Sequence, residues 1–109
     1  MLPFKEEKIS ELESIRTFSS NVDFGDLYWH RDREDRTIVV ISSDGWKFQF
    51  DDSIPTEMTN GSLINIKKGQ YHRIIKGSGD LKIKVIKKNI SNRSRRVQSI
   101  LEIINNSKS

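Results

Sequence analysis

The sequence predicts one all-β domain, an antiparallel β-barrel or sandwich. Between residues 22 and 90, short apolar segments alternate with turn residues, and no helical period interrupts them. This rhythm is typical of antiparallel barrels and sandwiches, and it differs from the alternation of strands and long helices in parallel α/β folds. A chain of 109 residues has room for one compact domain of this kind.

The first 21 residues show a different pattern and predict a helical extension. Ile9, Leu12 and Ile15 follow one another at near-helical spacing, and Pro3 stands just ahead of them. Proline is tolerated in the first turn of a helix because the backbone N–H that it lacks has no partner there. We therefore expect a short N-terminal helix within residues 5–16.

Residues 22–90 are expected to form the barrel itself. Three segments rich in Asn, Asp, Gly and Ser provide tight turns, namely Asp44-Gly45, Asn60-Gly61 and Gly77–Asp80. The expected strands are 24–29, 36–42, 46–50, 63–66, 71–75 and 81–87. The two-residue period of a half-buried strand is clearest in the aromatic side chains Trp46, Phe48 and Phe50.

Residues 91–109 predict an amphipathic C-terminal helix appended to the barrel. Asn92 or Ser94 can cap its start, and Asn105 marks its end. One helical stripe carries the apolar side chains Val97, Ile100, Leu101, Ile103 and Ile104.

A motif with chemical meaning lies between Gly61 and His72. Gly61, Gly69 and His72 have the spacing of the second cupin motif, although Lys67 stands where that motif usually has a proline. The paired glycines permit the tight turns that bring one strand in and swing the next back across the barrel mouth. The chain therefore resembles a small single-domain cupin of the RmlC-like jelly-roll type.

The first cupin motif has a weaker counterpart in His30-Arg31-Asp32. That motif begins with two histidines one residue apart, and here His30 and Asp32 project to the same face of an extended segment. The glutamate that follows in the motif has no counterpart, because Arg36 and Thr37 occupy the matching positions. The first motif is therefore degenerate in this chain.

The resemblance implies a pocket inside the barrel with a divalent metal ion held by His30, Asp32 and His72. Two imidazoles and one carboxylate are a sufficient facial set for an ion with open coordination positions, with Fe, Mn, Ni and Zn as the candidates. The residues expected to contact a small-molecule ligand are Trp29, Arg36, Trp46 and Tyr71. Aromatic side chains of this region, Tyr28 and Phe48 included, can stack on a ligand or fill the core or a dimer interface.

A metal-free pocket is the alternative. A guanidinium from Arg36 inside the same cavity would repel a cation and neutralise Asp32. The polar residues would then form a cluster that receives an anionic or sugar-like ligand. A histidine next to an aspartate can also act as a general base.

Composition excludes several classes of site. The chain has no cysteine, so disulfides, thiolate metal sites and a cysteine nucleophile are excluded. Its net charge is +4, with Lys and Arg concentrated in the second half and at Arg93, Arg95 and Arg96. Such an excess can mark a nucleic-acid surface, but alternating lysines in 81–87 fit the solvated face of a strand, which we favour. No segment approaches the roughly 20 apolar residues of a membrane span, and we expect a cytoplasmic protein.

Two functional hypotheses follow. The first is a cupin-fold protein that binds a small molecule, with or without a divalent metal, and whose reaction the sequence does not specify. The second is a non-catalytic assembly module, in which the C-terminal helix packs on a second subunit and the basic tail contacts an acidic partner or nucleic acid. Either hypothesis is compatible with a homodimer.

Overall fold

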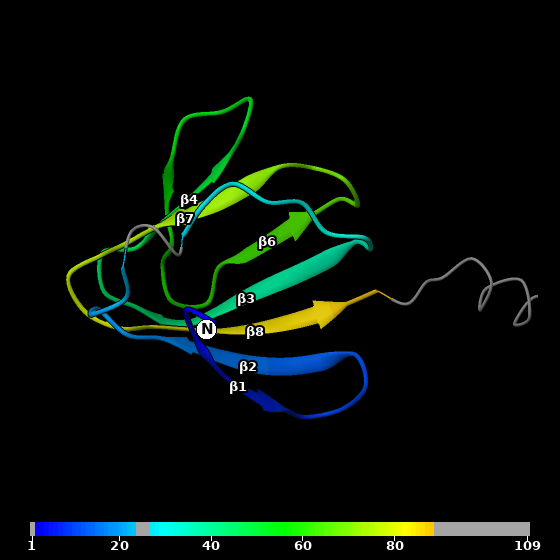
Figure 1. Ribbon diagram of the computed structural model, residues 1–109, viewed down its shortest axis with the longest axis horizontal. Coiled ribbons are helices and arrows are strands. Elements are labelled where there is room, and N and C mark those ends of the chain that lie inside the picture. Colours follow the sequence, from blue (N-terminus) through cyan, green and yellow to red (C-terminus); the bar gives the residue numbers. More distant parts are fainter. Residues whose placement is uncertain (1, 24–26, 89–109) are drawn as a thin grey trace, which may run out of the picture.

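The computed structural model describes residues 2–23 and 27–88, and within them all regular structure is β (Figure 1). A larger sheet has the strand order β1-β2-β8-β3-β6, and a smaller sheet has the order β5-β4-β7. Every strand pairing in both sheets is antiparallel. The strands are β1 (Lys5–Lys8), β2 (Glu13–Phe18), β3 (Arg36–Ser43), β4 (Lys47–Phe50), β5 (Thr56–Glu57), β6 (Leu63–Ile66), β7 (His72–Ile75) and β8 (Leu81–Lys87).

The all-β prediction is confirmed, but the closed barrel is not. In the described part of the chain the two sheets share no continuous strand pairing, so they face each other as an open sandwich. The predicted strand at 24–29 is also wrong over its described residues 27–29, which are not in a strand. Only His30 pairs there, through an isolated bridge to His72.

The predicted N-terminal helix is wrong, because residues 5–18 form strands β1 and β2 instead. Strand β2 pairs along its whole length with β8, from Glu13 opposite Ile86 to Phe18 opposite Leu81. Ile9 and Leu12, which suggested a helical stripe, are exposed in the turn between β1 and β2. Long-range pairing with a buried strand outweighs the short local period here, as tertiary context commonly outweighs local propensity. The predicted C-terminal helix lies outside the described residues.

The hydrophobic core lies between the two sheets and follows the period of two. In β8, Leu81, Ile83 and Val85 are buried, while the lysines between them point outward, as the sequence predicts. The other buried apolar side chains of the core are Phe18, Ile38, Val40, Trp46, Phe48, Met58 and Ile66. Each fully buried aliphatic or aromatic side chain contributes about 1.5–3 kcal/mol of transfer free energy. Within residues 2–23 and 27–88 no helix is long and apolar enough to cross a membrane.

A pair of leucines tests this placement of the core. Leu81 is 0% exposed and Leu63 is 64% exposed. We expect Leu81→Ala to lower the free energy of unfolding by about 2–5 kcal/mol, because it leaves a cavity between the sheets. Leu63→Ala should change it by no more than about 0.5 kcal/mol. Urea unfolding followed by tryptophan fluorescence measures both, and equal losses for the two variants would contradict the assigned core.

Candidate metal centre

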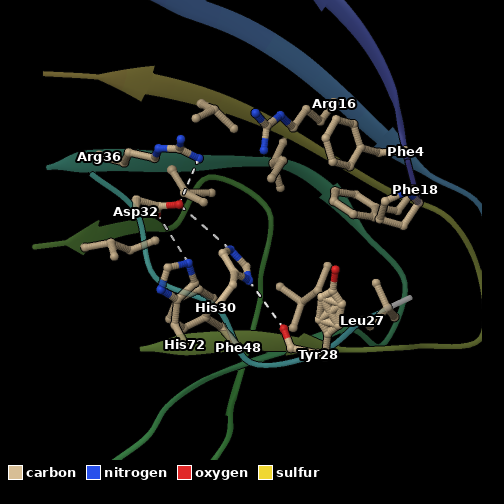
Figure 2. Close-up of a pocket in the computed structure, with 16 residues that line it drawn as sticks. Phe4, Arg16, Phe18, Leu27, Tyr28, His30, Asp32, Arg36, Phe48 and His72 are labelled. Atoms are coloured by element: carbon tan, nitrogen blue, oxygen red, sulfur yellow. Dashed lines mark hydrogen bonds and ion pairs between the residues drawn. The ribbon is translucent and has the colours of Figure 1, made fainter. Parts of the chain in front are cut away.

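A pocket of about 260 Å³ lies between the two sheets at the end where β7 begins. Strands β2, β3 and β8 of the larger sheet form one wall, and β4, β7 and the segment before β3 form the other (Figure 2). Most of the lining is apolar. The polar side chains that enter it are Arg16, Tyr28, His30, Asp32, Arg36 and His72.

The two histidines are brought together by backbone pairing. His30 N–H donates to the His72 carbonyl at 3.0 Å, and His72 N–H donates to the His30 carbonyl at 2.9 Å. Directly opposed residues of an antiparallel pair project to the same face. The two imidazole centroids are consequently 4.2 Å apart, with one ring edge directed at the other.

Asp32 joins the histidines because the chain stays extended for two further residues. Gly69 N–H donates to the Asp32 carbonyl at 2.9 Å, so the turn that precedes His72 also holds this segment in place. Gly69 has a φ of 81°, a conformation that side chains with a Cβ rarely adopt. The glycine and histidine of the second motif therefore position the residues of the first.

The imidazole hydrogen bonds direct both Nε2 atoms into the pocket. His72 Nδ1 lies 2.8 Å from the Gln70 carbonyl oxygen, and His30 Nδ1 lies 3.3 Å from the Tyr28 carbonyl oxygen. A carbonyl oxygen only accepts, so each Nδ1 carries the proton and each Nε2 of the neutral ring presents a lone pair. Burial lowers the pKa of the His72 imidazole, and the nearby His30 and Arg36 lower it further. The hydrogen bond to the Gln70 carbonyl and the charge of Asp32 raise the pKa and offset part of this shift.

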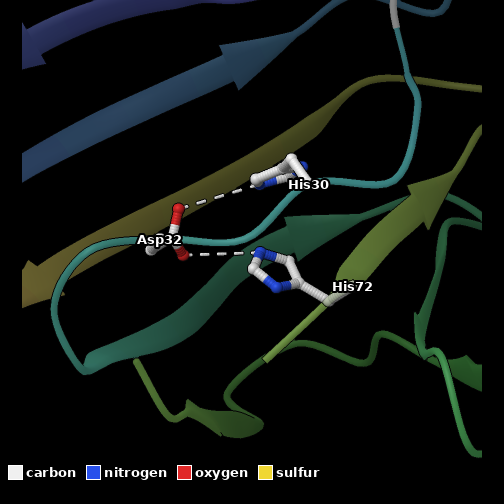
Figure 3. A group of neighbouring side chains, drawn as sticks. All are labelled: His30, Asp32 and His72. Carbon is white, nitrogen blue, oxygen red and sulfur yellow. Dashed lines mark ion pairs between the residues drawn. The ribbon is translucent and has the colours of Figure 1, made fainter. Parts of the chain in front are cut away.

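Asp32 faces these lone pairs with a buried carboxylate (Figure 3). Its Oδ2 is 3.5 Å from His72 Nε2, and its Oδ1 is 4.0 Å from His30 Nε2. Among the described residues Oδ2 has no hydrogen-bond partner. A buried acceptor without a donor costs about 1–3 kcal/mol. A cation between the three side chains would satisfy the acceptor and both lone pairs together.

Arg36 holds the other carboxylate oxygen. Its Nη1 lies 3.3 Å from Asp32 Oδ1, and its Nε donates to Glu34 Oε2 at 2.6 Å. Arg36 stands at a position that the first cupin motif gives to glutamate. The nearby carboxylate of Glu34 pairs with Arg36 and is not among the three residues of the metal group. Four of the predicted site residues therefore line one pocket, namely His30, Asp32, Arg36 and His72. The two histidines and Asp32 form a group that could hold a metal ion, with ligand atoms within 4.8 Å of one another.

The other three predicted ligand contacts lie outside the pocket lining. Trp46 is fully buried in the core, where its Nε1 donates to the Gly79 carbonyl at 2.6 Å. Trp29 is 39% exposed and lies under Arg73, and Tyr71 is 41% exposed beside Arg31. Trp29 and Tyr71 each immediately precede a histidine in an extended segment, so their side chains point to the opposite face.

Residues from the N-terminal region complete the pocket and were not predicted. Phe4, Arg16 and Phe18 line it, and the alternation of Ser14, Arg16 and Phe18 along β2 places all three on the inner face. Reading that alternation as a strand would have placed Arg16 and Phe18 on one face, although it gives no signal for Phe4. The helical interpretation of residues 5–16 concealed it.

Comparisons with known proteins bear on the fold. No model of a known protein family matches the sequence, and no curated protein matches it. Among solved structures, a cupin-2 domain containing protein from Shewanella frigidimarina superposes with a TM-score of 0.55 at 21% identity, over 75% of this chain and 78% of that one. This chain has the cupin fold.

Two larger cupin-fold structures are also similar. The structures of the DMSP lyases RdDddP and RnDddQII give a TM-score of 0.61 at 12% identity, over 71% of this chain and 37% of that one. HppE with FeII and substrate gives a TM-score of 0.57 at 9% identity, over 77% of this chain and 52% of that one. The chain thus spans about a third to a half of the length of these two proteins, and the similarity concerns the cupin fold alone.

The tautomer of His72 is a direct test of this geometry. In the metal-free protein at pH 7.5, long-range proton–nitrogen NMR correlations should identify His72 as a neutral ring protonated at Nδ1, because the Gln70 carbonyl accepts that proton. His30, whose contact to Tyr28 is longer, serves as the internal comparison. A ring protonated at Nε2 would donate to Asp32 and would contradict the arrangement of lone pairs.

Proposed function

We propose that this cupin-fold protein binds one divalent metal ion through His30, Asp32 and His72 and holds a small molecule beside it. The observation that carries the proposal is the buried Asp32 Oδ2, which lacks a hydrogen-bond donor and faces the Nε2 of a neutral imidazole at 3.5 Å. Electron pairs directed at one another in a buried site are stabilised by a cation.

The donor set agrees with this chemistry. Ligand atoms bound to one ion at about 2.1 Å lie roughly 3–4 Å from each other, and two of the separations here are 3.5 and 4.0 Å. Two imidazoles and a carboxylate suit Fe(II), and they also accept Mn, Ni or Zn. Such an ion supplies open coordination positions and Lewis acidity to a bound molecule.

Residues around the group prepare it for this role. The Gln70 and Tyr28 carbonyls fix the imidazole orientations, as second-layer partners of metal-bound histidines commonly do. Arg36 fixes Asp32 through Oδ1 and leaves Oδ2 directed at His72. Phe48 stacks on the His72 ring at 5.5 Å and keeps water from that side. His30 remains half exposed, which gives a ligand access.

The homodimer remains a prediction of the sequence. The partner contacts of the non-catalytic alternative involve the C-terminal stripe and the basic residues of 91–109, which lie outside the described residues. The three residues of the metal group and the pocket-lining residues named above all lie within residues 2–23 and 27–88 of one chain.

Metal binding is tested with a pair of matched substitutions. We expect anaerobic equilibrium dialysis against Fe(II), Mn(II), Ni(II) or Zn(II) to give one bound ion per chain for at least one of the four metals. Asp32→Asn should lower the affinity at least tenfold, since the amide is a poor ligand for such an ion. Asp51→Asn makes the same chemical change at an exposed position and should bind as the unmodified chain does.

Thermal unfolding gives a second readout of the same proposal. A saturating metal should raise the melting temperature of the unmodified protein and of Asp51→Asn, because the ion binds the folded state, but not that of Asp32→Asn. The proposal fails if none of the four metals binds stoichiometrically, or if Asp32→Asn retains the full affinity.

A further inference from the structure

Besides Arg36, one further arginine, Arg16, lines the pocket and is not part of the metal group. Arg16 belongs to β2 in the larger sheet, whereas His72 belongs to β7 in the smaller sheet (Figure 2). Along β2, Ser14 and Phe18 on the same face are buried, and Ile83, the residue opposite Arg16 on β8, is buried as well. An arginine at an inward-facing strand position is costly unless its donors are paired.

The protein pairs only part of the Arg16 guanidinium. Its Nε donates to Glu6 Oε2 at 2.9 Å, and its Cζ lies 4.3 Å from the centre of the Phe4 ring. Among the described residues its two Nη groups have no hydrogen-bond partner. The guanidinium is therefore held in place by Glu6 and Phe4 and keeps the two nitrogens that most often bind an oxyanion.

The charges of the pocket indicate the charge of its ligand. Arg16, Arg36 and Asp32 line the pocket, and Glu6 and Glu34 pair with the two arginines. These five ionised side chains sum to one negative charge, and an imidazole that binds a metal through a lone pair adds none. The divalent ion of the proposed function, on which this step rests, changes the sum to one positive charge. A ligand with one negative charge would leave the occupied pocket neutral.

The space between Arg16 and the metal group is apolar. Phe18, Leu27 and Phe48 line it together with aliphatic side chains of β3 and β8. The cavity of about 260 Å³ lies below the range of roughly 300–1,000 Å³ that accommodates drug-sized ligands. The ligand is therefore a small molecule with an apolar body.

We propose that Arg16 binds the carboxylate of a small ligand with an apolar body and directs the other end of that ligand toward His30, Asp32 and His72. A carboxylate carries the single charge that the pocket lacks, whereas a phosphate monoester carries closer to two at neutral pH. The two free Nη groups match the two oxygens of a carboxylate. Arg16 is then a residue that determines which molecules enter the site.

The test compares an acid with its uncharged amide. Hexanoate and hexanamide are titrated into the full-length protein, with and without Zn(II), and amide chemical shifts of pocket residues such as Phe18 and Ile83 are followed by NMR. We expect hexanoate to bind at least tenfold more tightly than hexanamide. Arg16→Gln should abolish this preference. Arg73→Gln, which removes an arginine outside the pocket lining, should retain it.

A second variant separates loss of charge recognition from loss of folding. Glu6→Gln keeps an oxygen that can accept from Arg16 Nε and removes one negative charge beside the guanidinium. We expect it to bind hexanoate more tightly than the unmodified chain does. Weaker binding by a Glu6→Gln protein with an unchanged NMR spectrum would contradict the assignment.

The outcomes for Arg16 and for the metal can be distinguished. Three results would each overturn the role of Arg16. The first is equal binding of acid and amide, and the second is no hexanoate binding up to about 10 mM. The third is hexanoate binding that survives Arg16→Gln because the acid coordinates zinc. Failure of Zn(II) and the other metals to bind would overturn the proposed function instead. An acid preference that depends on Arg16 in the metal-free protein would still support the carboxylate site.

Discussion

The pair of backbone hydrogen bonds between His30 and His72 is the constraint on which the site depends. It is the isolated bridge that ties the segment before β3 to the start of β7, and it places the two imidazoles on one face. Asp32 enters the group because it lies two residues further along the same extended segment, held by Gly69 N–H. Both bridged residues line the pocket between the two sheets.

Electrostatics then decides what this arrangement can hold. Both histidines direct their Nδ1 atoms at backbone carbonyls, and burial lowers the pKa of the His72 imidazole. The buried carboxylate of Asp32 consequently faces imidazole lone pairs. Without a bound cation, its Oδ2 would need a hydrogen-bond donor at this position, and the described residues provide none. Arg36 offsets part of this excess through Oδ1, and Glu34 in turn balances Arg36. The arrangement has an acceptor-rich centre at Asp32, in agreement with the proposed cation, and a donor-rich position at Arg16, in agreement with the proposed carboxylate ligand.

Much of the central part of the chain could be predicted from sequence because its signals are local. Alternation in 46–50 and 81–87, and the glycine spacing that ends at His72, correspond to β4, β8 and the turn before β7. The same rule of alternation explains why Trp29 and Tyr71 point away from the pocket, although they were chosen for being next to the two histidines. Proximity along the chain does not by itself give side-chain direction.

The N-terminal region could not be predicted in the same way. Ile9, Leu12 and Ile15 have helical spacing, and only pairing with β8, which is far away in the sequence, makes Ser14, Arg16 and Phe18 the inward set. The local alternation indicates a strand, but the partner strand that decides which face is buried is distant in the sequence, so Arg16 and Phe4 were missed as pocket residues. The expectation of a closed barrel failed for a related reason, since closure depends on pairings between strand edges that no single segment specifies.

X-ray absorption spectroscopy of the zinc-loaded protein can count the histidines bound to the metal. The chain contains only two histidines, so the number of imidazoles in the outer-shell scattering identifies the ligands without further substitutions. We expect two imidazoles and oxygen ligands around each zinc ion. A zinc ion with one imidazole or none would contradict the joint role of His30 and His72.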